Sequence, residues 1–214
     1  MLSVVSALES LDKFVGVAKE LARLPALLLP QYREAAQDLY EICQRLLAAN
    51  ENLSRWLYRF LYFDFRHPDA RTRFLTLVQE YRTMKHGPDF QKLKFSCGDI
   101  GAIYYRNISA KLGNWFTRKT RREEVEGIFQ MLTNADNDMV AFTYDQVIAC
   151  LDKLLGEAEA HMDTGREEEA EAVRLKGKAE LRAVTERLEK FSGELADLVV
   201  SFAAIAQVPV TLGG

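Results

Sequence analysis

The side chains best suited to catalysis or binding lie in the irregular segment 86–105 and just after it. An imidazole, a thiol, a carboxylate, a phenol and a guanidinium occur there close together, at His86, Cys97, Asp99, Tyr104 and Arg106. Loops held by a rigid scaffold often carry catalytic or binding residues. An enzyme or nucleic-acid-binding protein with an unrecognised site would therefore be expected to use residues 86–122.

Known catalytic and cofactor motifs do not support an enzyme. The sequence contains no phosphate-binding Gly-x-x-x-x-Gly-Lys, no Gly-x-Gly-x-x-Gly and no Gly-x-Ser-x-Gly. Zinc requires clustered Cys and His, which are scattered here. A diiron bundle requires two Glu-x-x-His pairs, and the nearest pattern is the segment Asp64 to His67. We therefore expect no metal and no cofactor.

A second group of side chains is basic and is better suited to binding an anion than to catalysis. It comprises Arg118, Lys119, Arg121 and Arg122, with Arg55 and Arg59 standing among aromatic residues farther upstream. One interpretation is structural, because cations favour the end of one helix and the glutamates from Glu123 onward favour the start of the next. The functional alternative is a binding patch for anionic lipid or nucleic acid.

The charge of the chain is divided unequally along its length. The formal net charge is −3, but residues 55–122 carry 15 Lys or Arg against 5 Asp or Glu, and residues 123–214 carry 8 against 19. These two parts can attract each other within one chain or between two chains, or the basic part can face an external anion. The overall pI near 5.7 argues against a dedicated nucleic-acid binder.

The elements that position these residues are predicted to be helices. From Gln31 to Phe65, apolar side chains recur at alternating steps of three and four, which is typical of bundles and coiled coils. The same register runs through a second long helix at about 166–206, and shorter helices are expected at about 3–24, 68–85, 100–116, 121–132 and 143–161. The prediction is an all-α, elongated antiparallel helical bundle in a single domain, with a possible sub-boundary near 122/123.

Two parts of the long helices predict special packing. The end of the first carries six aromatics on all sides, and we expect them to be buried on every side by residues 74–81 and 90–105. The end of the second, at 198–205, is apolar on more than one face. Such a helix is either central in its bundle or part of an interface between copies.

Cellular context and function follow from these features as expectations. Three widely spaced cysteines, no basic start before an apolar core and no apolar run of 18 residues predict a cytoplasmic protein without a transmembrane span. The leading hypothesis is a non-enzymatic protein–protein interaction or scaffold module that forms homo-oligomers. The alternative is a membrane-active or anionic-lipid-binding bundle, whose outline is similar to the four-helix executioner domains of cell-death proteins.

Overall fold

The computed structural model describes residues 8–23, 30–87 and 139–209. Every regular element in these ranges is an α-helix, which confirms the predicted all-α class. The helices are α2 (Glu9–Ala22), α3 (Pro30–Leu61), α4 (Ala70–Lys85), α8 (Met139–Asp163) and α9 (Glu167–Ala206). The two predicted long helices are α3 and α9. The helices predicted at 100–116 and 121–132, and the possible sub-boundary, lie outside the described residues.

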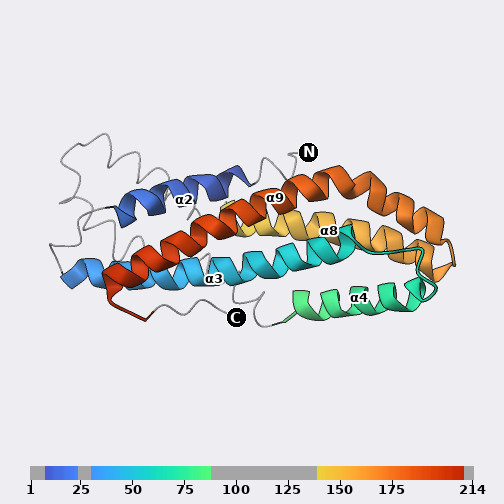
Figure 1. Cartoon of the computed structure of the whole chain (residues 1–214), viewed down its shortest axis with the longest axis horizontal. Helices are drawn as coiled ribbons and strands as arrows, with labels where there is room; N and C mark the ends of the chain where they lie inside the picture. Colours follow the sequence, from blue (N-terminus) through green and yellow to red (C-terminus); the bar gives the residue numbers. More distant parts are fainter. Residues whose placement is uncertain (1–7, 24–29, 88–138, 210–214) are drawn as a thin grey trace.

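The helices form an elongated antiparallel bundle (Figure 1). Helices α3 and α8 run in one direction along the long axis, while α2, α4 and α9 run in the other. Helix α9 packs against α2, α3 and α8, and α4 packs against α8 near the end of α3. No helix in the described part of the chain combines the length and apolarity needed to cross a membrane.

The central position of α9 explains why its last turns are apolar on more than one face. Its predicted seam is buried at every position from Leu181 to Phe202, and Val199 and Ala203 on a neighbouring face are buried as well. Different faces of the helix therefore contact different partner helices. At Gly177 the backbone comes so close to α8 that a Cβ atom would lie 2.8 Å from Cδ1 of Leu154.

Helix α3 ends at Leu61, four residues before the predicted boundary at Phe65. The chain turns there, and Phe65 folds back to become 3% exposed. Its ring centroid lies 4.7 Å from that of Phe63 and 5.1 Å from that of Phe74. The turn is favoured over a continued helix because it buries these rings against α4, and each buried aromatic contributes a large apolar area.

The aromatic end of α3 is largely buried, but not on every side. Trp56 and Phe60 are buried, and their ring centroids lie 5.7 Å from Tyr81 and 6.3 Å from Phe74. The predicted covering by residues 74–81 is therefore confirmed, whereas residues 90–105 lie outside the described part. The expectation of burial on every side is wrong at Tyr62, which is 63% exposed. A helix at the edge of the bundle keeps one side in water.

Candidate functional site

A groove with a volume of about 580 Å³ opens between α3 and α9. Both helices contribute polar and charged side chains to its wall. They are Glu51, Ser54, Arg55, Tyr58 and Arg59 from α3, and Glu189 and Ser192 from α9. The i, i+4 spacing of these α3 residues places them on one side of the helix, next to the buried seam. Two of the predicted anion-binding residues thus share one groove.

The two arginines in the groove have different surroundings. The guanidinium of Arg59 lies 4.3 Å from the ring centroid of Trp56, and its Nη2 lies 2.7 Å from Oε2 of Glu80 on α4. It is held by a cation–π contact and an ion pair. Neither Arg55 nor Glu51, one turn before it, makes a side-chain ion pair or hydrogen bond with any residue in the described ranges. These two exposed charges remain available.

Tyr58 and Glu189 join the two walls of the groove. The Tyr58 hydroxyl donates a hydrogen bond to the carboxylate of Glu189. This bond is the main cause of a raised pKa for the Tyr58 phenol, since the carboxylate stabilises the protonated form. The Tyr58 phenol therefore stays protonated, and its hydrogen bond partly satisfies the carboxylate of Glu189 within the protein.

A buried polar network lies beneath the groove. Asn50 is completely buried, and its Nδ2 donates to the carbonyl oxygen of Leu188 and to Oγ of Ser192, each at 2.6 Å. The hydroxyl of Tyr144 on α8 donates to Oδ1 of Asn50 at 3.3 Å. The network connects α3, α8 and α9. Ser54, one turn after Asn50, is 8% exposed, and its hydroxyl has no hydrogen-bond partner in the described structure.

Sequence reasoning did not assign any other residue of the groove and its network to a site, although Tyr58 is one of the six aromatics at the end of the first long helix. The residues missed are Asn50, Glu51, Ser54, Tyr58, Glu189 and Ser192. The available signal was a pair of polar residues, Asn50 and Ser54, spaced by one turn beside an apolar seam. Such a pair indicates a polar strip at the edge of a helix interface. Its partners on α9 are more than a hundred positions away in the chain, so the pattern on α3 could not identify them.

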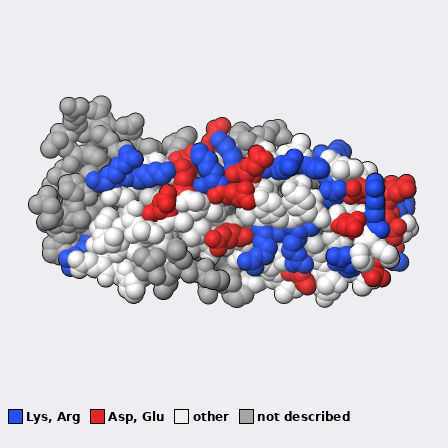
Figure 2. Space-filling model, in the orientation of Figure 1, with Lys and Arg blue, Asp and Glu red and all other residues white. Residues whose placement is uncertain are grey.

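The basic segment makes ion pairs with the acidic C-terminal helices within the same chain. Arg82 on α4 donates to both carboxylate oxygens of Glu159 on α8, at 3.0 and 2.5 Å. Lys85 pairs with Asp152, which also accepts a hydrogen bond from Tyr81 at 2.8 Å. On the face shown in Figure 2, basic and acidic side chains lie close together along much of the described surface. Part of the charge asymmetry is thus used to hold α4 against α8.

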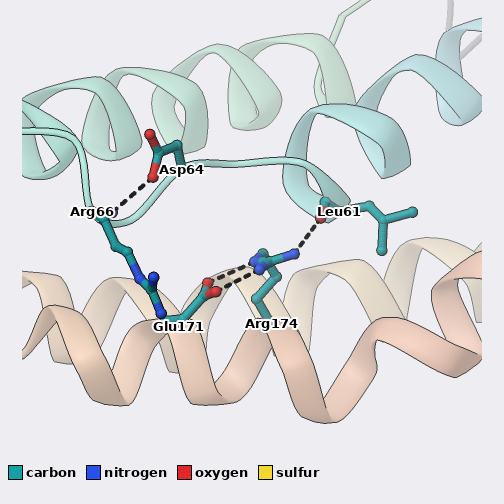
Figure 3. Close-up of polar contacts among 5 residues, drawn as sticks. All are labelled: Leu61, Asp64, Arg66, Glu171 and Arg174. Atoms are coloured by element: carbon teal, nitrogen blue, oxygen red, sulfur yellow. Dashed lines mark hydrogen bonds and ion pairs between the residues drawn. The ribbon is translucent and has the colours of Figure 1, made fainter.

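Other arginines bind the carbonyl ends of helices (Figure 3). Arg174 on α9 donates from Nη1 to the carbonyl oxygen of Leu61 at 2.6 Å, and its guanidinium also pairs with Glu171. The hydrogen bond to Glu171 is the main reason that the pKa of Arg174 is raised. Arg71 likewise donates to the carbonyl oxygen of Asp163 at the end of α8 at 3.1 Å. Cations are stabilising at helix C-termini, where carbonyl groups lack partners.

The predicted loop site is described only at His86. His86 is the residue that caps the C-terminus of α4, and its backbone N–H donates to the carbonyl oxygen of Arg82. Its side chain is exposed. The other members of that site, and the second cluster of predicted anion-binding residues, lie outside the described residues. They are Cys97, Asp99, Tyr104 and Arg106, and Arg118, Lys119, Arg121 and Arg122.

The described thiols are in inert surroundings. Burial raises the pKa of Cys43 to about 12 and also raises that of Cys150. A thiol with a raised pKa is a poor nucleophile, because the thiolate is the reactive form. Within the described ranges, no three residues among His, Cys, Asp and Glu lie together in a group that could hold a metal ion.

Comparisons with protein-family models, with curated proteins and with solved structures find no match for this chain.

Proposed function

We propose that this protein is a non-enzymatic helical-bundle interaction module whose partner is a second copy of itself. The observation that carries the proposal is an exposed strip along α9, which we call the outer strip. Leu175 and Val200 are 51% and 49% exposed, although most large apolar residues of α9 are buried. They are 25 positions apart, or about seven helical turns, so they lie on the same side of α9 and roughly 37 Å apart.

Two of the charges between these apolar residues can pair between two copies of the chain. Glu186 and Lys190 are exposed and make no ion pair with residues of the described chain. They lie near the midpoint between Leu175 and Val200. If two copies of α9 meet antiparallel about that midpoint, Leu175 of each lies against Val200 of the other, and Glu186 lies against Lys190. Such a two-fold arrangement buries the same surface on both copies.

The membrane-active alternative receives less support from the position of α2. Its apolar residues Leu11, Phe14 and Val15 are buried in the bundle. Lys19 on its polar side pairs with Glu194 of α9 at 2.9 Å, and Asp12 pairs with Arg187 at 3.2 Å. Binding of α2 to lipid through its apolar face would require these contacts to break. A face already covered by protein does not favour membrane insertion.

The proposal is tested by size-exclusion chromatography with light scattering over a range of protein concentrations. The wild type is expected to form dimers, and Val200→Glu is expected to shift the protein to monomer, because it places a charge in the apolar contact. Glu186→Lys alone should also favour monomer by setting like charges opposite each other. The double variant Glu186→Lys, Lys190→Glu should restore the dimer, because the opposite charges face each other again.

A matched control is Arg73→Glu, a charge reversal on the exposed face of α4, away from the outer strip. It should leave the dimer unchanged. A wild type that stays monomeric at every concentration contradicts the proposal. A dimer that persists in Val200→Glu contradicts the role of the outer strip.

A further inference from the structure

Among the residues that line the groove between α3 and α9, Glu51 and Arg55 are available charges of opposite sign, and the outer strip does not use them. Glu51 and Arg55 are exposed and separated by one helical turn, a spacing at which Glu and Arg commonly pair. Here they pair neither with each other nor with another residue in the described part of the chain. Both charged groups can therefore act on a molecule that enters the groove.

The other charges of the groove are already engaged by the protein. Arg59 pairs with Glu80 and lies over Trp56, and Glu189 accepts the hydrogen bond from Tyr58. A simple anion would meet the carboxylates of Glu51 and Glu189 as well as Arg55. A simple cation would meet the two guanidinium groups. A molecule that carries one charge of each sign avoids both repulsions.

The hydroxyl of Ser54 provides an independent indication of a ligand. Ser54 lies between Glu51 and Arg55 in sequence and lines the groove, yet its buried hydroxyl has no partner in the described structure. A buried donor without an acceptor is unfavourable, and a ligand oxygen would relieve that cost. The hydroxyl is shut off from water in the free chain. A ligand oxygen reaches it once neighbouring side chains move, and exposed side chains reorient within nanoseconds.

We propose that this groove binds a small zwitterion that has an oxyanion and a primary ammonium group a few bonds apart. The oxyanion lies on Arg55 and accepts a hydrogen bond from Ser54, while the ammonium donates to Glu51. The groove is open to solvent, and its volume of about 580 Å³ leaves room for a substituent beyond the two charges. Free amino acids and phosphoethanolamine headgroups share this chemistry.

The test is titration of the isotope-labelled full chain, followed by NMR chemical shifts and calorimetry. The probes are L-serine, O-phosphoethanolamine, acetate and ethylammonium. We expect at least one zwitterion to bind with a Kd of about 1 mM or tighter, and both singly charged probes to bind roughly tenfold more weakly or not at all. Vesicles with and without phosphatidylethanolamine separate a lipid headgroup from a free ligand.

Four variants test the assignment of roles. Arg55→Gln and Glu51→Gln should each weaken zwitterion binding roughly tenfold, and Arg73→Gln on α4 should leave it unchanged. Ser54→Ala should weaken binding without lowering the Tm of the free protein, because it removes an unpaired hydroxyl. Equal affinity for acetate and the zwitterions would overturn the proposal, and so would binding that Arg55→Gln and Glu51→Gln do not affect or no binding of any probe. None of these outcomes bears on dimerisation through α9.

Discussion

The buried Asn50 should contribute strongly to stability, because its side chain makes three hydrogen bonds inside the bundle. It donates to the Leu188 carbonyl and to Ser192, and it accepts from Tyr144. A hydrogen bond between neutral groups contributes about 1 kcal/mol net, so Asn50→Ala should lower the free energy of unfolding by about 3 kcal/mol. For a chain of this size, each kcal/mol shifts Tm by about 2–4 °C, which gives a decrease of about 6–12 °C.

Equilibrium unfolding in urea, followed by far-ultraviolet circular dichroism, measures this difference directly. Asn52→Ala is a matched control on the same helix, because Asn52 is half-buried and makes no side-chain hydrogen bond with the described residues. It should change the free energy of unfolding by less than about 0.5 kcal/mol. Asn50→Leu fills the space that alanine leaves empty, so it should cost less than Asn50→Ala. If Asn50→Ala matches the control, the network does not stabilise the bundle.

Three further predictions concern packing, helix ends and pH. Gly177→Val should lower the free energy of unfolding by about 1 kcal/mol, because the new side chain overlaps the end of Leu154 at the contact of α8 and α9. In thermal melts, a Leu154→Ala background should reduce that loss, and an additive effect would contradict the overlap. Arg174→Met should lower the free energy of unfolding in urea by about 2 kcal/mol, since it removes a charged donor from the Leu61 carbonyl. An unchanged midpoint would show that solvent replaces this donor. Burial raises the pKa of Cys43 from 9.0 in the unfolded chain to about 12 in the folded protein. The buried thiol therefore contributes its full stability below pH 9, and this contribution is lost as pH rises, because the unfolded chain then ionises more readily than the folded one. The stability advantage of the wild type over Cys43→Ala should therefore shrink by about 1.4 kcal/mol per pH unit between pH 9 and pH 12, and a constant advantage would contradict this burial.

The fold could be predicted where one helix carries its own repeating pattern. The seam of α9 from Leu181 to Phe202 was visible as apolar steps of three and four, and each of its positions is buried. The end of α3 was less predictable. Helical spacing continues through Phe63, but contact of Phe65 with Phe74 on α4 favours a turn. Such tertiary contacts override local periodicity, which also does not predict that Tyr62 is exposed.

The candidate site was only partly predictable, because its walls come from distant parts of the chain. Arg55 and Arg59 could be identified as cations among aromatics. The pattern does not predict that Arg59 forms an ion pair with Glu80, or that Arg55 forms none with the described residues. Glu189 reaches the groove only because α9 crosses α3 in one particular register. Spacing within a helix predicts which residues share a face, whereas the register between two helices depends on packing of the whole core.

The central place of α9 also has a consequence for how the chain folds. Among the described helices, α9 is the last to be synthesised, yet α2, α3 and α8 all pack on it. The contact of Lys19 with Glu194 spans 175 positions, and that of Asn50 with Leu188 spans 138. Contacts of such long range slow folding, because a long loop must close before they form. At about 5–20 residues per second on the ribosome, α9 is completed roughly 7–40 s after α2 and α3, so their apolar faces stay uncovered for that time. Chaperones protect such surfaces during synthesis.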